Sequence, residues 1–220
     1  MPGLRDLLAP PACLVCRAAG TDLCPPCRRG LPWLPDPRCV RCGLPQPCRR
    51  CPAAAQAFDA SWAPVAYAGP VPRLVAGLKA RRARGATETM VAALLRAPYG
   101  LCGGDRLLVP VPTAAARART RGFDQATALA AGLADRGFGE LRPVLERVGA
   151  ATRQRGAGRG ERLAAGRIAV RVRTGAVVPP VCVLIDDVHT TGATFDACAR
   201  ALKAGGAARV VALAYARALP

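Results

Sequence analysis

Cysteines spaced two residues apart are the clearest chemical signal in the first quarter of the chain. Eight of the eleven cysteines fall before residue 52, and they form four Cys-x-x-Cys pairs. One such pair brings two thiolates to the same tetrahedral ion, and two pairs complete a four-cysteine zinc site. The sequence therefore predicts two zinc ions, held by Cys13, Cys16, Cys24, Cys27, Cys39, Cys42, Cys48 and Cys51.

The way these cysteines share the ions stays open. Sequential ligation keeps the loops short, but a cross-braced pairing also fits the spacing. Disulfides need an oxidising compartment, and the N-terminus lacks the features of a signal peptide; an iron–sulfur cluster is a further alternative. Four protein ligands leave no open position, so we expect structural zinc. Cys102, Cys182 and Cys198 have no such partner and are predicted to be small core residues.

A second chemical signal lies near the C-terminus, where a β-branched run leads through two carboxylates into a polar turn. It runs Val183-Leu184-Ile185-Asp186-Asp187-Val188-His189-Thr190-Thr191-Gly192-Ala193-Thr194. Open α/β sheets bind ligands at the carboxyl ends of their strands. The N–H groups that begin the next helix, with hydroxyls of Thr190, Thr191 and Thr194, would form a phosphate cradle. The two carboxylates suit vicinal hydroxyls, so the string predicts a ligand with a sugar diol and a 5′-phosphate.

Each residue of this string also has a simpler interpretation. Asp186 and Asp187 are common turn formers, and Thr190 or Thr191 is a common helix N-cap. For any one residue the simpler interpretation is the better one, and only the whole string favours a ligand site. His189 is the only histidine. It could carry a proton at neutral pH, but we expect it at the surface or packed in a loop.

Alternating strand and helix signals begin at Phe58. We expect strands near 61–67, 106–111, 144–148, 168–172, 181–185 and 210–215. We expect helices near 71–82, 87–96, 124–136 and 193–204, and an Arg/Gly-rich loop over 149–162. Strands that alternate with helices imply a parallel α/β sheet flanked by helices. The predicted organisation is a zinc-binding module over 1–57 and an α/β domain over 58–220.

The composition narrows the range of functions. The 220 residues carry 32 basic and 14 acidic side chains, a formal charge of +18. Such a charge points to a phosphate-rich partner, although compositional drift explains the excess equally well. Eight arginines and one acid lie between Arg147 and Arg173. No segment approaches the roughly 20 apolar residues of a membrane span, so we expect a cytoplasmic protein.

Together the two signals resemble the ComF/GntX family, which joins a double zinc ribbon to a type I phosphoribosyltransferase-like domain. The string from Val183 is similar to the signature for phosphoribosyl pyrophosphate (PRPP). Further segments that match this family are Tyr67, Leu78-Lys79, Val109-Pro110-Val111-Pro112, Arg119, Arg121-Gly122-Phe123-Asp124-Gln125, Leu129-Ala130, Gln154 and Arg162. The family is linked to natural competence and DNA uptake.

The resemblance implies a role for each matching residue. Asp186 and Asp187 would contact the ribose hydroxyls, and the 5′-phosphate would be held by Thr190, Thr191, Gly192, Ala193 and Thr194. Pyrophosphate would face Arg117, Arg119 and Arg121. Arg162 would belong to a mobile loop that closes over the ligand with Arg153, Arg155 and Arg159. Mg²⁺, which prefers oxygen ligands, would bridge pyrophosphate and ribose oxygens.

Three functions follow from these expectations. The first is a PRPP-binding, ComF-like protein that handles incoming single-stranded DNA with competence or recombination proteins. The second is an active phosphoribosyltransferase that transfers ribose 5-phosphate to an unidentified acceptor and releases pyrophosphate. The third is a zinc-ribbon adaptor whose second domain has lost its ligand, which the intact 186–194 string argues against. After the last predicted strand we expect no room for a C-terminal hood, the segment that would read a base. We hypothesise that the zinc module occupies the position of that hood, near Asp186.

Overall fold

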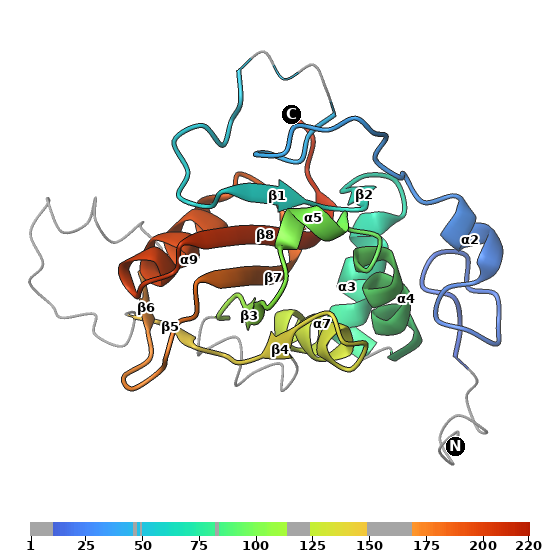
Figure 1. Cartoon of the computed structure of the whole chain (residues 1–220). Coiled ribbons are helices and arrows are strands. Elements are labelled where there is room, and N and C mark those ends of the chain that lie inside the picture. The colour runs from blue at the N-terminus through green and yellow to red at the C-terminus, as the bar shows by residue number, and fades with distance from the viewer. Residues whose placement is uncertain (1–10, 46–47, 49, 82–83, 114–123, 149–168) are drawn as a thin grey trace, which may run out of the picture.

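The computed structural model describes residues 11–45, 48, 50–81, 84–113, 124–148 and 169–220. Six α-helices and eight strands lie within these ranges (Figure 1). The strands are β1 (Ala60–Trp62), β2 (Val65–Ala66), β3 (Leu107–Pro110), β4 (Glu140–Leu141), β5 (Leu145–Arg147), β6 (Val170–Val172), β7 (Val181–His189) and β8 (Arg209–Arg217). The helices are α2 (Pro25–Arg29), α3 (Val71–Arg81), α4 (Arg84–Leu94), α5 (Tyr99–Cys102), α7 (Gln125–Ala134) and α9 (Ala193–Ala204).

A parallel sheet forms the centre of the molecule, as the alternation of strand and helix signals predicted. Its strand order is β1-β8-β7-β3-β4, and β2 also pairs with β8. All of these pairs are parallel. β7 and β8 lie inside the sheet and are covered on both faces, which is why each is a nearly continuous apolar run. β5 and β6 form a separate antiparallel ribbon.

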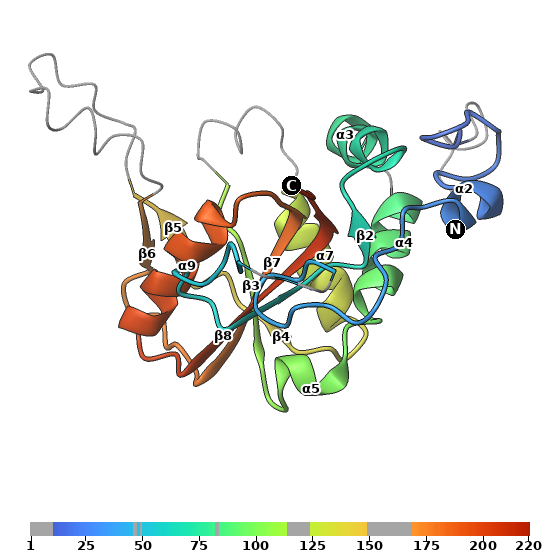
Figure 2. The ribbon, with the colours of Figure 1, turned by 90° about the horizontal axis from the view of Figure 1, so that it is seen from above.

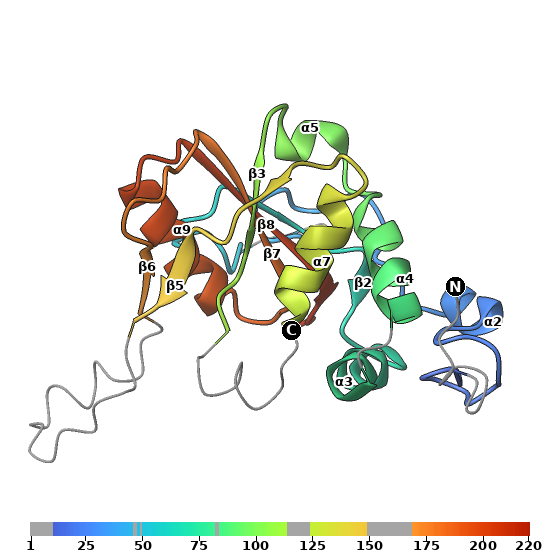
Figure 3. The same cartoon turned by 90° about the horizontal axis from the view of Figure 1, so that it is seen from below.

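Helices cover both faces of this sheet (Figures 1 and 3). Val183 and Ile185 of β7 pack on the face that α4 and α7 cover, whereas Cys182 and Leu184 pack on the α9 face. This division follows from the alternation of side chains along a strand. Gly132 of α7 lies so close to Val91 of α4 that an added Cβ would clash with it. The two helices therefore need glycine where they cross.

The elements differ from the predicted ones in a few places. The strand expected over 61–67 is split at Ala63-Pro64 into β1 and β2, because proline has no N–H for a strand ladder. The strand expected over 181–185 continues to His189. The short elements α2, α5 and β4 were not expected. α9 spans the predicted residues 193–204, whereas Ile168 and the loop over 149–162 lie outside the described residues.

The two cysteine-rich halves of the N-terminal segment lie on different parts of the α/β domain (Figure 2). The first half lies beside α3 and α4, where Leu14 contacts Gly77 and the Asp22 carboxylate accepts the Gly85 N–H at 3.0 Å. The second half runs along β1, where the Val40 carbonyl accepts the Ser61 N–H at 2.9 Å. Among the described helices, none is both long and apolar enough to cross a membrane.

Candidate functional site

The first cysteine tetrad is built from two short turns and the start of α2. Cys24 is the N-cap of α2 and Cys27 lies inside it, while Cys13 and Cys16 come from the preceding loop. The four sulfurs lie within 4.8 Å of one another, and those of Cys16 and Cys24 are 3.6 Å apart. Zn–S bonds of about 2.3 Å separate the sulfurs of a tetrahedral site by about 3.8 Å. The tetrad therefore fits a zinc ion.

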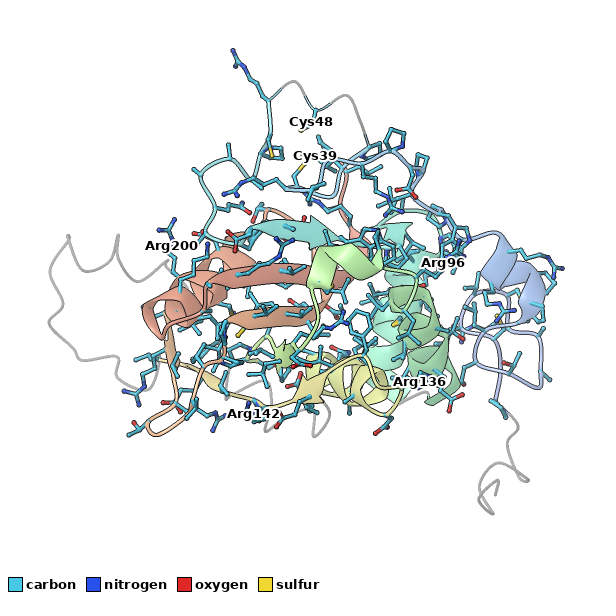
Figure 4. The ribbon with its side chains drawn as sticks, viewed as in Figure 1. Cys39, Cys48, Arg96, Arg136, Arg142 and Arg200 are labelled. Carbon is cyan, nitrogen blue, oxygen red and sulfur yellow. The ribbon has the colours of Figure 1, made fainter. Side chains whose placement is uncertain are left out.

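The second tetrad has the same geometry. The sulfurs of Cys39 and Cys51 are 4.0 Å apart, and those of Cys42 and Cys48 are 3.6 Å apart. All four lie within 4.8 Å of one another. Figure 4 shows Cys39 and Cys48 above β1. The pairing that the spacing left open is thus sequential, and the two tetrads fit two structural zinc ions.

Backbone N–H groups lower the pKa of one thiol in each tetrad. Burial alone would raise the pKa of Cys13, but N–H groups of Cys16, Cys24 and Val15 lower it to about 6. At Cys39 the balance also favours a lowered pKa, because the N–H groups of Cys42 and Arg41 outweigh burial. Zinc binds the thiolate, so a lowered pKa at one sulfur of each tetrad favours the form that binds the metal.

The three remaining cysteines lie in the core, as predicted. Cys102, Cys182 and Cys198 are fully buried. Burial raises the pKa of Cys182 to about 11 and that of Cys198 to about 12. Thiols with such pKa values stay protonated at neutral pH and behave as small apolar side chains.

The candidate ligand site lies at the carboxyl edge of the sheet. Asp186 and Asp187 lie within β7 rather than in a loop after it, so they point to opposite faces of the sheet. Asp186 is half-buried on the α9 side, where its charge adds to burial in raising the pKa of Cys198. Asp187 is 8% exposed, and its N–H donates to the Asp186 carboxylate at 2.8 Å.

A short turn joins β7 to α9. Thr190 and Thr191 are exposed, and Thr194 is half-buried in the first turn of the helix. Gly192 is the N-cap of α9 with φ of 83°, a left-handed conformation that favours glycine. The Thr191 hydroxyl accepts the Ala193 N–H at 3.4 Å. The first N–H groups of a helix have no partner within it and favour an anion.

A pocket of about 380 Å³ lies at the same edge, where β3 ends and α7 begins. Thr113 and Thr127 both donate hydroxyl hydrogen bonds to Asp124, at 3.2 and 2.9 Å. Arg147 and Arg173, from the β5–β6 ribbon and just after it, also line this pocket, together with Glu146. Sequence reasoning did not single out these two arginines, although they bound the arginine-rich segment.

Several predicted site residues lie outside the described residues. They are Arg117, Arg119, Arg121, Arg153, Arg155, Arg159 and Arg162. The described part of the site therefore consists of the β7 carboxylates, the 190–194 turn and the pocket beside β3. The predicted roles of all these residues stay predictions.

The expected location of His189 was wrong. The residue is 2% exposed and ends β7, where its ring contacts those of Phe58 and Phe195 at centroid distances of 5.7 and 5.1 Å. Burial, together with the charge of Arg217, lowers its pKa to about 3. A histidine that stays neutral at pH 7 is a packing residue and is a poor proton carrier there.

The second tetrad lies against the turn that follows Asp186, while the first lies away from it. The Arg217 guanidinium donates both to the Cys42 carbonyl at 3.1 Å and to the His189 carbonyl at 2.9 Å. Gln56 donates its side-chain amide to the Thr191 carbonyl at 2.7 Å. The hypothesis of a zinc module near Asp186 thus holds for the second half of the module only.

Comparison with known proteins bears on the N-terminal segment. Residues 4–58 match the model of the double zinc ribbon domain family. No curated protein matches the chain. The family match and the two tetrads together confirm the predicted N-terminal double zinc ribbon.

Proposed function

We propose that the α/β domain is phosphoribosyltransferase-like and binds PRPP with Mg²⁺, and that the chain is a ComF-like protein of DNA uptake. The main support for the proposal is the set of chemical groups that lies at the carboxyl edge of the sheet. Two carboxylates, a left-handed glycine and the N-terminus of α9 follow one another over Asp186–Thr194. A pocket lined by Arg147 and Arg173 lies at the same edge of the sheet.

The parts of PRPP differ in chemistry, and this edge offers a matching group for each. The carboxylates of Asp186 and Asp187, which lie on opposite faces of β7, would each accept a hydrogen bond from a different ribose hydroxyl, and the N-terminus of α9 would bind a phosphate dianion. The guanidinium groups of Arg147 and Arg173 suit pyrophosphate. Mg²⁺ would be held by pyrophosphate and ribose oxygens, with water completing its shell.

Calorimetric titration of the full chain with PRPP and Mg²⁺ tests this proposal. We expect the Asp186→Asn/Asp187→Asn variant to bind PRPP at least about tenfold more weakly, because two charged hydrogen-bond acceptors are lost. Asp105→Asn/Asp135→Asn is the matched control, since both residues are exposed and lie at the opposite edge of the sheet. Absence of PRPP binding by the wild type would refute the proposal.

An active transferase is the alternative, and it rests on the same site. With PRPP bound, release of pyrophosphate only when an acceptor is added would establish it. The acceptors to test are nucleobases, ammonia and amines, each in the presence of Mg²⁺. Tight PRPP binding without release would instead favour a protein that senses PRPP.

A basic pocket favours the nucleic-acid part of the proposal. It has a volume of about 390 Å³ and lies between α2 and α4, lined by Arg28, Arg29, Arg96 and Trp33. Arg96 stacks on Trp33 at 4.8 Å (Figure 4 labels Arg96). Within the described part of the chain, none of the three arginines forms an ion pair. A single strand offers both phosphates and planar bases to such a pocket.

Fluorescence anisotropy with labelled single-stranded DNA over a range of salt concentrations tests this part. The variant Arg28→Gln/Arg29→Gln/Arg96→Gln should lose three phosphate contacts. The negative slope of log affinity against log salt concentration should then become shallower by about 2. The control removes equal charge elsewhere, with Arg136→Gln/Arg142→Gln/Arg171→Gln. An equal change of this slope in both variants would mean that the overall charge of the protein, rather than this pocket, binds DNA.

A further inference from the structure

Arg217, at the end of β8, joins the second tetrad to the candidate phosphate turn. Its side chain is 5% exposed. Nε donates to the Cys42 carbonyl at 3.1 Å, and Nη1 donates to the His189 carbonyl at 2.9 Å and to the Thr190 carbonyl. One planar guanidinium thus contacts the backbone of a zinc ligand and the first residue of the turn.

The linker after Cys51 makes a second connection. The Gln56 amide donates to the Thr191 carbonyl at 2.7 Å and lies so close to Gly192 that an added Cβ there would clash with it. The next residue, Ala57, donates its N–H to the Asp196 carboxylate of α9 at 2.6 Å.

Arg41 holds this linker from inside the second tetrad. It lies between the ligands Cys39 and Cys42. Its guanidinium donates to the Ala53 carbonyl at 3.0 Å and to the Gln56 carbonyl at 2.6 Å. The backbone that carries Gln56 is therefore fixed to the same loop that binds the metal.

The charges around Arg217 agree with these contacts. Among the described residues its hydrogen bonds go to carbonyl oxygens, which carry no full charge. A zinc ion with four thiolates carries a net charge of −2. A loaded second tetrad therefore supplies a nearby negative charge to a buried cation, and such compensation lowers the cost of burying Arg217.

We propose that the second tetrad, with Arg217 and Gln56 as positioning residues, holds the 190–194 turn in its binding conformation. Among the described residues, the first tetrad makes no such connection, since its half of the module packs on α3 and α4. Loss of the second zinc ion should thus loosen the turn, whereas loss of the first should leave it ordered. The effect on the turn is independent of the ligand, while its effect on PRPP affinity rests on the proposed function.

Hydrogen exchange of the full chain, read by mass spectrometry, tests the proposal directly. Cys48→Ser and Cys27→Ser each remove one half-buried ligand, from the second and first tetrad. In Cys48→Ser we expect exchange at residues 190–196 to rise about tenfold or more. In Cys27→Ser the rise should be confined to the first module half and the helices beside it. Unchanged exchange of the turn after loss of the second zinc ion would overturn the proposal.

Variants that keep both zinc ions separate positioning from folding of the module. Arg217→Gln and Gln56→Ala should retain two zinc ions per chain yet speed exchange of the turn. Arg217→Lys keeps the charge but loses the fork of donors, so we expect only partial rescue. Arg209→Gln, at the other end of β8, is the matched control because its guanidinium bonds the Leu101 carbonyl, far from the turn.

PRPP titrations of the same variants separate this proposal from the proposed function. If the wild type binds PRPP, Arg217→Gln should bind it about tenfold more weakly and Arg209→Gln as well as the wild type. If the wild type binds no PRPP but the exchange pattern holds, the ligand assignment fails and the positioning role stands. If PRPP binds and neither exchange nor affinity responds to Arg217→Gln or Gln56→Ala, the positioning role is wrong.

Discussion

The two cysteine tetrads use the same ligands but have different neighbours. The first packs beside α3 and α4, next to the basic pocket that contains Trp33 and Arg96. The second lies over β1 and contacts the turn at the start of α9 through Arg217 and Gln56. Ligand type and spacing therefore account for the metal, whereas the surfaces on which the tetrads pack account for what each zinc ion supports.

The chain between the tetrads explains why they separate. Trp33 pairs with Val65 of β2, and Leu34 donates its N–H to the Pro64 carbonyl at 3.0 Å. These contacts fix residues 31–34 along the sheet edge, and the chain that follows carries Cys39 and Cys48 of the second tetrad above β1 (Figure 4). A module of two zinc sites thus spans two separate faces of one domain.

Removing a buried ligand from each tetrad should give the largest difference between them. Structural zinc contributes on the order of 10 kcal/mol to the folding of isolated zinc-finger peptides. We expect Cys13→Ser and Cys42→Ser each to hold one zinc ion, measured by elemental analysis. The two tryptophans differ in their neighbours: Trp33 packs in one cluster with Cys24 and Cys27 of the first tetrad, whereas Trp62 stacks with Arg38, the residue before Cys39 of the second.

Emission should therefore change at a different tryptophan in each variant. With Trp62→Phe as background, Cys13→Ser should shift the emission of Trp33; with Trp33→Phe, Cys42→Ser should shift that of Trp62. Equal shifts of both tryptophans in both variants would show that the tetrads unfold as one unit. The comparison between two separate surfaces would then lose its basis.

Local signals in the sequence predicted the metal sites and α9, and long-range contacts supplied the rest. Each Cys-x-x-Cys pair is recognised within four residues, and the two glycines directly after Ala204, Gly205 and Gly206, favour the end of a helix there. The sequential pairing, by contrast, needed the folded loops. The burial of His189 depends on Phe58, which is far away in sequence. Arg217 looks like any terminal arginine until β8 places it beside Cys42, so no sequence pattern could have identified it.

The buried His189 should make the surroundings of the second tetrad sensitive to acid. Its pKa is about 3 in the folded chain and about 6.5 when unfolded, so the unfolded chain binds the extra proton between these values. The stability that neutral His189 contributes is fully present above pH 6.5 and falls by roughly 1.4 kcal/mol per pH unit as the pH drops towards 3. In His189→Phe this loss should disappear, which urea unfolding at several pH values would detect. If the dependence of stability on pH were the same in His189→Phe and the wild type, protonation of His189 would not destabilise the folded chain.

Asp59 should contribute a smaller effect, also next to the second tetrad. Its carboxylate accepts from Lys203 and from the Val210 N–H, each at 2.7 Å. Burial opposes the charge, but these donors outweigh it and lower the pKa of Asp59. Asp59→Asn should cost about 2 kcal/mol at pH 7. Because the folded pKa is lowered, the difference from wild type should shrink as the pH falls below about 4, and a difference that persisted at pH 2 would contradict this origin.

The two arginine–tryptophan stacks give the finest comparison between the tetrads. Arg38, beside Cys39, stacks on Trp62 at 5.0 Å with 9% of its side chain exposed, and it also bonds Asp36 at 2.8 Å. Arg96 stacks on Trp33 at 4.8 Å but is exposed. A cation held over a ring is worth about 0.5–1 kcal/mol when exposed and about 2 kcal/mol when desolvated.

Replacement of each arginine by methionine keeps most of the side-chain length and removes the charge. We expect Arg38→Met to cost about 1 kcal/mol and Arg96→Met about 0.5 kcal/mol or less, measured by urea unfolding of each variant. Arg96→Met, the variant with the smaller loss of stability, should lose more DNA affinity than Arg38→Met. An exposed arginine over Trp33 contributes little to folding and is available to a phosphate. A reversed order of the two stability losses would place the tighter packing at the first tetrad.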